Sequence, residues 1–115
     1  MTPGDADAFA RAWLDAWNAR DLDAILVHYA EDVVFLSPVA ARALGDGRVV
    51  GKESLRAYWR ERLAAQPALR FELRAVLVGH ACLTILYRNH RAQDVAETFE
   101  VDAAGLVTRA FACYR

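Results

Sequence analysis

Cysteine is scarce in this chain of 115 residues, and no segment carries an excess of charge of one sign. The two cysteines, Cys82 and Cys113, form no CxxC pair, and they are expected to be reduced thiols inside apolar runs. Fourteen basic and fifteen acidic residues leave a formal net charge of −1. This balance gives no broad positive field for nucleic acid or an anionic membrane.

Long apolar runs are also missing. None approaches the roughly 18 residues of a membrane span, and the polar, acidic segment 1–7 does not resemble a signal peptide. A hydrophobic fraction of 56% is nevertheless enough for a full core. The sequence therefore predicts a soluble, cytoplasmic protein with a single domain over residues 1–115.

Helical periodicity dominates the first third of the chain. Phe9, Trp13 and Trp17 recur every four residues, which predicts an amphipathic helix that closes at Asn18–Arg20. Two acidic residues before this stripe are candidate N-terminal caps: Asp5 and Asp7. Asp21 can cap a second helix, whose apolar face comprises Leu22, Ile25, Leu26 and Tyr29.

The middle of the chain alternates between helix and loop signals. Val33–Ser37 is expected to be a short strand, and Pro38–Gly47 a loop with its turn at Gly45–Gly47. A third helix is predicted over Lys52–Ala65, and Pro67 follows its end.

The remainder of the chain is typical of strands joined by short turns. Four are predicted: Leu69–Val78, Ala81–Arg88, Asp94–Val101 and Leu106–Tyr114. One face of the first is expected to hold Phe71, Leu73, Ala75 and Leu77. Helices followed by an antiparallel meander indicate an α+β fold.

Glu97 is an ionisable residue in an apolar position. Val95, Glu97, Phe99 and Val101 share one strand face, and the other three are hydrophobic. A carboxyl group held in an apolar cavity is typical of an acid/base site. The alternative is a carboxyl group near a strand end, or one satisfied by an internal donor, with no chemistry. The residues alone leave both interpretations open.

The last hairpin extends this argument. A four-residue turn at Asp102–Gly105 would place Glu97 opposite Ala110, so that Ala110, Ala112 and Tyr114 line the same cavity. The opposite, outer face would then hold Val107, Arg109, Phe111 and Cys113. Such an apolar outer face needs a partner, and we expect a homodimer through it.

Other chemistry-bearing patterns are absent from the sequence. None of the three histidines, His28, His80 and His90, has a second ligand at metal spacing, so no metal site and no cofactor are predicted. There is no GxGxxG, P-loop or nucleophile elbow. Ser37 has no identifiable histidine partner, and Arg88 is a candidate pocket cation.

Several local strings, in order and spacing, resemble the nuclear transport factor 2-like superfamily, in particular its SnoaL-like and ketosteroid isomerase-like branches. They span nearly the whole chain: Trp17–Asp23, Tyr29–Val33, Ser37–Val39, Gly51–Trp59 and Phe99–Gly105. The resemblance implies a cone-shaped curved sheet closed by three helices around a pocket, and a homodimer through the sheet. It implies no particular activity, because the fold hosts both enzymes and non-enzymes.

The ketosteroid isomerase residues carry over only in part. That enzyme uses an Asp base, and an oxyanion hole formed by a Tyr and a protonated Asp. By the resemblance, Ser37 stands at the base position, Trp13 at the tyrosine position and Glu97 at the protonated Asp position. Only one of the three roles therefore keeps a carboxyl group, which argues against steroid isomerisation by that mechanism.

The resemblance also implies a pocket with polar-tipped aromatic walls. Beside Glu97, its expected lining comprises Trp13, Tyr29, Phe35, Ser37, Tyr58, Trp59, Phe99, Ala110 and Tyr114. Such a set suits an apolar ligand that bears a few oxygens, although each member is also an ordinary core residue.

Two functions follow from these expectations. The protein is either an acid/base enzyme of isomerase, cyclase or dehydratase type, or a non-catalytic binding or dimeric scaffold domain. In the enzyme, Glu97 would transfer protons on a small apolar ketone, and Trp13 or Ser37 would hold its oxygen. In the binding domain, Glu97 would be a polar anchor. The missing base at Ser37 favours the second interpretation.

Overall fold

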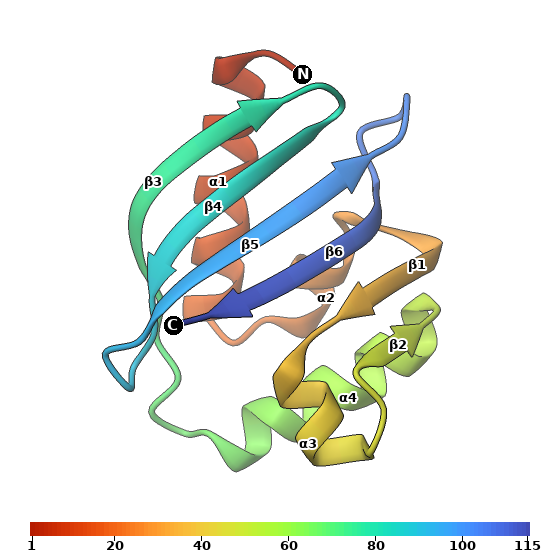
Figure 1. Ribbon diagram of the computed structural model, residues 1–115, viewed down its shortest axis with the longest axis vertical. Coiled ribbons are helices and arrows are strands. Elements are labelled where there is room, and N and C mark those ends of the chain that lie inside the picture. Colours follow the sequence, from red (N-terminus) through yellow and green to blue (C-terminus); the bar gives the residue numbers. More distant parts are fainter.

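Helices dominate the N-terminal half and strands the C-terminal half of the computed structural model, which describes residues 1–115 (Figure 1). The helices are α1 (Pro3–Asn18), α2 (Leu22–Leu26), α3 (Pro38–Leu44) and α4 (Lys52–Ala65). The strands are β1 (Tyr29–Leu36), β2 (Arg48–Val50), β3 (Glu72–Gly79), β4 (Cys82–Arg88), β5 (Asp94–Val101) and β6 (Val107–Tyr114). The α+β class expected from the sequence is confirmed.

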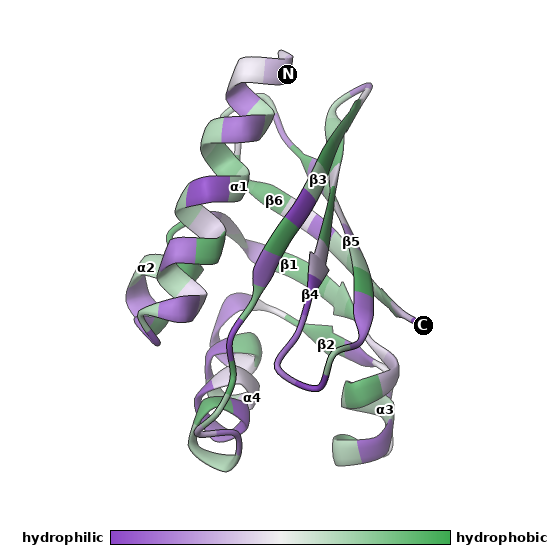
Figure 2. Cartoon of the chain, turned by 90° about the vertical axis from the view of Figure 1, so that its left-hand side faces the viewer, coloured by the Kyte–Doolittle hydropathy of each residue, from purple (hydrophilic) through white to green (hydrophobic).

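All six strands form one curved sheet in the order β2-β1-β6-β5-β4-β3. Strands β3 to β6 are antiparallel neighbours, as expected, whereas β1 pairs with β6 in parallel. Helix α1 lies across one face of this sheet, and α3 and α4 lie at its lower end (Figures 1 and 2). The curved sheet therefore has the shape of a cone, and the helices close it.

Helix α1 begins with a complete capping box. The Thr2 hydroxyl accepts a hydrogen bond from the Asp5 backbone N–H, and the Asp5 carboxylate accepts one from the Thr2 N–H, each at 3.1 Å. Thr2 is therefore the cap, and Asp5 is its reciprocal partner. Asp7 lies within the helix, so its expected capping role is wrong.

A helix replaces the loop expected over Pro38–Gly47. The Ser37 hydroxyl accepts a hydrogen bond from the Val39 N–H at 3.1 Å, and Pro38 takes the first helical position, where its missing N–H costs nothing. Gly45 ends α3 in the left-handed conformation at φ +78°. The glycine turn signal thus belongs only to the end of this helix.

The second helix is shorter than expected, because Tyr29 begins strand β1. Asp21 caps α2 as predicted by accepting from the Ala24 N–H at 3.1 Å. Immediately after α2, the Val107 N–H donates to the His28 carbonyl at 2.8 Å, and Tyr29 pairs with Val107. This contact with a strand distant in sequence draws Tyr29 into the sheet, with its side chain still buried.

Two register shifts reverse the predicted orientation of side chains on β3 and β6. In β3 the register shifts between Leu73 and Ala75, so that Val76 packs on the core and Leu77 is 56% exposed. Between Glu100 and Val101 the pairing with β6 shifts as well, so that Val107 is fully buried and not on the outer face. A bulge adds one residue to a strand and so reverses every side chain beyond it.

A turn that is one residue longer than expected and this one-residue shift together move the partner of Glu97 along β6. Glu97 lies opposite Ala112, and Phe99 lies opposite Ala110, so the expected register is displaced by two residues. A displacement by two keeps the face unchanged. Ala110, Ala112 and Tyr114 therefore still share the inner face with Glu97, as the sequence predicted.

The core lies between α1 and the inner face of the sheet. Its largest fully buried side chains include Trp13, Tyr29 and Phe99. The Trp13 ring meets the Phe99 ring edge-on, with centroids 5.4 Å apart. Apolar and polar bands alternate along α1 in Figure 2, as expected for a helix with one buried stripe. None of the helices combines the length and the hydrophobicity that a membrane-spanning helix requires.

Candidate functional site

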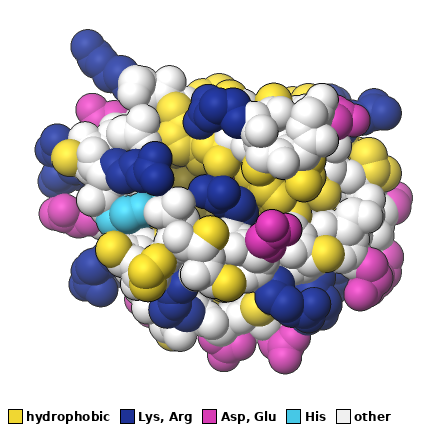
Figure 3. Space-filling view, turned by 90° about the horizontal axis from the view of Figure 1, so that it is seen from below, with side chains coloured by type: hydrophobic (Ala, Val, Ile, Leu, Met, Phe, Trp, Pro, Cys, Tyr) yellow, Lys and Arg dark blue, Asp and Glu magenta, His cyan; other side chains and the backbone are white.

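A cavity of about 330 Å³ opens at the end of the molecule where α3 and α4 meet the sheet. Figure 3 views this end and shows apolar side chains in a hollow surrounded by basic ones. Seven of the ten predicted site residues line the cavity: Trp13, Phe35, Ser37, Tyr58, Trp59, Glu97 and Tyr114. The curved sheet thus brings together side chains from α1, β1, α4, β5 and β6.

Three predicted pocket residues are instead part of the core. Tyr29, Phe99 and Ala110 are almost completely buried and do not line the cavity. The Trp13 ring packs against Phe99, and Ala110 pairs with Phe99 on the neighbouring strand. Tyr29 is fully engaged with α1, because its hydroxyl accepts the Trp13 indole N–H at 2.9 Å.

That hydrogen bond also corrects the role expected for Trp13. Its indole nitrogen has one proton, and this proton is used within the core. Trp13 therefore contributes an apolar ring face to the cavity and no donor for a ligand oxygen. The Ser37 oxygen is the acceptor in the α3 cap, which leaves its hydroxyl hydrogen to be donated. A hydrogen bond from Ser37 to Tyr114 lowers the pKa of that phenol and so opposes the effect of burial.

Glu97 is 4% exposed and has one hydrogen-bond partner, the Tyr87 hydroxyl, which donates to Oε1 at 3.1 Å. Burial raises the pKa of Glu97 from 4.5 to about 8, and the hydrogen bond from Tyr87 partly opposes this rise. The carboxyl group is therefore mostly protonated at neutral pH, and it can donate from its second oxygen. Ser37 and Glu97 are the two buried polar residues other than aromatic ones, and both line the cavity.

Tyr87 is a site residue that sequence reasoning missed. It faces inward on β4 together with Leu83 and Ile85, and Ile85 pairs with Glu97 on β5. The alternation of β4 carried this information, but it needed the register of the β4–β5 hairpin. Burial, followed by the nearby Glu97, raises the pKa of the Tyr87 phenol well above its ordinary value of 10. The hydroxyl thus remains a donor at physiological pH.

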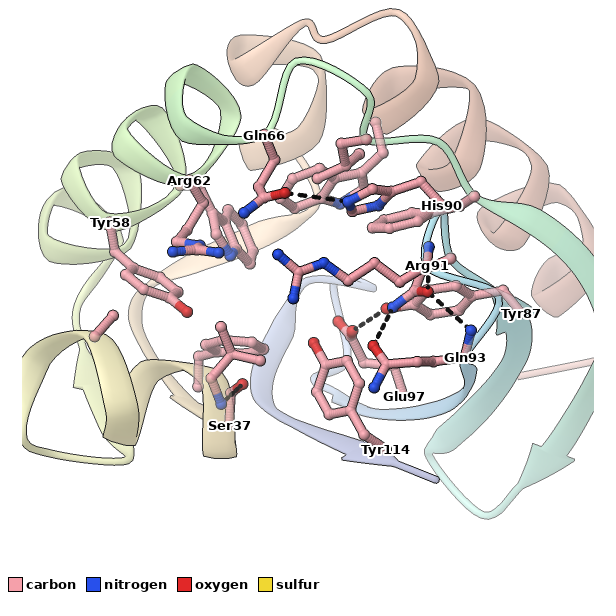
Figure 4. A pocket seen from close by; sticks show the side chains of 18 of the residues that line it. Ser37, Tyr58, Arg62, Gln66, Tyr87, His90, Arg91, Gln93, Glu97 and Tyr114 are labelled. Atoms are coloured by element: carbon pink, nitrogen blue, oxygen red, sulfur yellow. Dashed lines mark hydrogen bonds between the residues drawn. The ribbon is translucent and has the colours of Figure 1, made fainter.

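Tyr114 and Tyr58 bring two more phenols to the cavity wall (Figure 4). Burial, followed by the effect of Glu97, raises the pKa of Tyr114 to about 12. Burial also raises the pKa of Tyr58, while the positive charges of Arg62 and Arg42 oppose that rise. Both hydroxyls are therefore neutral, and the two arginines act on this end of the cavity.

Trp17 is a second lining residue that the sequence pattern did not predict for the pocket. It packs edge-to-face on Trp59 and lines the cavity. Its buried indole N–H has no hydrogen-bond partner. A buried donor without an acceptor costs about 1–3 kcal/mol, and a ligand acceptor that reached this N–H would offset that cost.

Asn18 holds Phe71, the residue directly before strand β3, against α1. Its Nδ2 donates to the Phe71 carbonyl at 2.9 Å, and its Oδ1 accepts the Phe71 N–H at 2.8 Å. The Phe71 ring stacks on Trp13 with centroids 5.8 Å apart and also lines the cavity. Asn18 therefore positions one aromatic wall, a role that the spacing of the sequence did not reveal.

Arginines lie at the rim of the cavity, in positions other than those expected. Arg42, Arg62 and Arg91 line it, from α3, α4 and the β4–β5 loop. Arg88 does not line it; this arginine is exposed and donates to the Ala92 carbonyl at 3.1 Å. Arg109 lies on the outer sheet face over the Phe111 ring, 5.0 Å from its centroid.

Comparison with known structures agrees with this architecture. A SnoaL-like protein of unknown function from Burkholderia thailandensis superposes with a TM-score of 0.97 at 42% identity, over 100% of this chain and 98% of that one. A protein with a cystatin-like fold from Methylobium petroleophilum gives 0.80 at 20% identity, over 99% and 78%. A SnoaL-like family protein from Agrobacterium tumefaciens, provisionally described as an isomerase, gives 0.77 at 16%, over 97% and 98%.

The curved sheet and its closing helices thus define a member of the nuclear transport factor 2-like superfamily. The SnoaL-like domain model matches residues 10–115, and the chain belongs to that family. No curated protein matches the sequence. Relatives of unknown function and a provisional isomerase share the fold, which leaves the activity to be argued from the site.

Proposed function

We propose that the protein binds a small, largely apolar, oxygen-bearing metabolite in this cavity, and that Glu97 acts on it as a general acid. The observation that carries the proposal is a buried carboxyl group at the cavity wall with a single phenol as its partner. With a pKa of about 8, Glu97 carries a proton at neutral pH and can release it without a large energetic penalty.

Tyr87 supports this role of Glu97. Its hydrogen bond lowers the pKa of Glu97, which means that it stabilises the carboxylate left after proton transfer. The buried Trp13 and Phe35 rings add apolar surface to the same cavity. A ketone or hydroxyl oxygen next to Glu97 would then meet a neutral acid in an apolar environment, where hydrogen bonds are stronger than in water.

The test is a panel of cyclic ketones and hydroxy ketones, followed by proton NMR in D₂O for exchange, isomerisation or loss of water. Turnover by the wild type that falls at least about a hundredfold in Glu97→Gln is expected for an acid/base residue. Glu61→Gln, an exposed change on α4, is the matched control. Equal rates in wild type and Glu97→Gln would show that Glu97 takes no part in the reaction.

The second candidate is a non-catalytic binding domain, and the surroundings of Ser37 favour it. Ser37 stands where a related isomerase has its base, and its oxygen is engaged in capping α3. In this case the panel compounds would bind without conversion, and Glu97→Gln would alter affinity only. Observed turnover of any panel compound would exclude this candidate.

We also propose that the outer face of the sheet forms a homodimer. Helices α1, α2 and α4 lie on the opposite side (Figure 2), and Arg109, Phe111 and Cys113 point outward from β6. Phe111→Glu should convert a dimer into a monomer in analytical ultracentrifugation, because a charge cannot be buried in an apolar contact. Val27→Glu, at an exposed site on the C-terminal side of α2, is the control. A monomeric wild type would contradict the proposal.

A further inference from the structure

The charges around the cavity are strongly unbalanced. Three of the fourteen basic residues line it, but only one of the fifteen acidic residues, Glu97, does so. Glu97 is mostly protonated at neutral pH and therefore cancels little of this positive charge. None of the arginines at the rim, Arg42, Arg62 and Arg91, forms an ion pair; the ion pairs of the protein lie elsewhere.

Arg62 and Arg91 converge on the same neutral group. The Gln66 amide lies 3.1 Å from Nε2 of His90. When its nitrogen donates to His90, its oxygen accepts from Arg62 and from Arg91, each at 3.3 Å. The opposite orientation would leave the amide nitrogen facing two guanidinium groups, so the first orientation satisfies every neighbour.

Two guanidinium groups next to one amide oxygen repel one another without a counter-charge. Figure 4 shows their side chains directed into the space between α4 and the β4–β5 loop, above Glu97 and Tyr114. A carboxylate in that space would accept paired hydrogen bonds from planar guanidinium groups and offset one of their two positive charges. The Gln66 oxygen shows that both guanidinium groups reach one common acceptor.

Two unpartnered polar atoms in the same wall point to a ligand. The Trp17 indole N–H is buried without an acceptor. The His90 Nδ1 is also buried and unpartnered, and it carries the proton when Nε2 accepts from Gln66. Both residues line the cavity, so two buried polar atoms without a partner belong to side chains of its wall.

We propose that the ligand is an aromatic or similarly apolar carboxylic acid, whose carboxylate binds between Arg62 and Arg91 while its apolar body lies against Trp13, Trp17 and Phe71. This inference deepens the proposed function and rests on the same cavity. The arginines at the mouth hold the anionic end, and the neutral Glu97 faces the uncharged part. The cavity volume of about 330 Å³ suits a molecule of this small size.

The probes are 2-naphthoate and the neutral 2-naphthamide, which share one ring system and differ in charge. Binding is followed at pH 7 by ¹⁵N–¹H NMR of the Trp17 indole N–H, which is assigned from the spectrum of Trp17→Phe. We expect 2-naphthoate to bind about tenfold more tightly than 2-naphthamide, because hydrogen bonds to charged groups are stronger than neutral ones.

Arg62→Gln and Arg91→Gln should each remove most of this tenfold preference and leave the affinity for 2-naphthamide unchanged. Arg60→Gln is the matched control, an exposed arginine on the same helix that does not line the cavity. Amide spectra of each variant report whether the fold is intact, and Arg62→Lys checks whether a point charge suffices without the planar fork.

The outcomes separate the two proposals. Equal affinity of the wild type for both probes would overturn the carboxylate inference and leave the binding cavity in place. The same would follow if the arginine variants lost affinity for 2-naphthoate and 2-naphthamide equally. No shift of the Trp17 signal with either probe up to millimolar concentration would overturn the cavity as a binding site as well. If both glutamine variants still preferred 2-naphthoate over 2-naphthamide, the carboxylate would bind away from the two arginines, and the inference would be wrong.

Discussion

Glu97→Gln should change how the stability of the protein depends on pH. An unfolded chain has Glu97 exposed with the ordinary pKa of 4.5, whereas in the folded protein this pKa is about 8. Between these values the folded state holds a proton that the unfolded state releases. The free energy of unfolding of the wild type therefore falls as pH rises through this window, by up to about 1.4 kcal/mol per pH unit from this group.

The size of the effect follows from the two pKa values. The loss in free energy of unfolding that the raised pKa of Glu97 causes is small below pH 4.5. It is about 1 kcal/mol at pH 5, about 3 kcal/mol at pH 7 and close to 5 kcal/mol well above pH 8. A domain of this kind has a total stability of only about 5–15 kcal/mol. A neutral glutamine can still accept the hydrogen bond from Tyr87, and it removes the part of the penalty that depends on pH.

The assay is urea unfolding of wild type and Glu97→Gln from pH 5 to pH 8, followed by tryptophan fluorescence. All other ionisable groups are the same in both proteins, so their contributions cancel in the difference. The unpaired amide donors of the glutamine add a constant cost of about 1–3 kcal/mol, so the slope is decisive and not the absolute value. We expect the stability difference to move by roughly 3 kcal/mol in favour of the variant across this range.

Glu61→Gln, an exposed change, is the control and should give a difference that does not vary with pH. A flat difference for Glu97→Gln would refute the reasoning. It would show that Glu97 is solvated or ion-paired in the folded protein, and the general-acid role would fall with it.

Three further predictions concern the hydrogen bonds around the cavity. The hydrogen bond from Tyr87 stabilises the Glu97 carboxylate, so its removal in Tyr87→Phe should raise the pKa of Glu97 above 8 in a carboxyl-carbon NMR titration. A lower pKa would contradict this. Tyr29→Phe should lower the free energy of unfolding by about 1–3 kcal/mol in urea, since the Trp13 N–H loses its buried acceptor; unchanged stability would be inconsistent with that bond. Asn18→Ala should cost about 2 kcal/mol in urea unfolding by removing both bonds to the Phe71 backbone, and unchanged stability would contradict this role of Asn18.

Local patterns were sufficient for most of the fold. The four-residue spacing of Phe9, Trp13 and Trp17 placed the first helix, and α4 has the predicted bounds Lys52–Ala65. These elements depend on contacts within one or two turns, which the sequence displays directly. The meander of four antiparallel strands was predictable for the same reason, because short turns connect neighbouring strands.

The errors lie where distant segments meet. Tyr29 fits the face of a helix, but pairing with Val107 draws it into a strand. Leu77 and Val107 follow perfect alternation until a register shift reverses their faces. A bulge is stabilised by the curvature of the whole sheet, so two-residue periodicity alone cannot locate it.

The candidate site shows the same division. The apolar neighbours of Glu97 on its strand were enough to predict that this carboxyl group points inward, and the structure buries it. The phenol that completes its environment, Tyr87, depends on the pairing of β4 with β5, which the turn residues alone left uncertain.

By itself, the sequence determined which residues are apolar, where they repeat and which acid lies among them. Only the tertiary structure decided that Arg62 from a helix and Arg91 from a loop meet at one amide oxygen, while the Trp17 N–H lacks a partner. The reason is physical. Periodicity records which side of an element faces the core, whereas the charge and unused donors of a cavity arise from how separate elements pack around it.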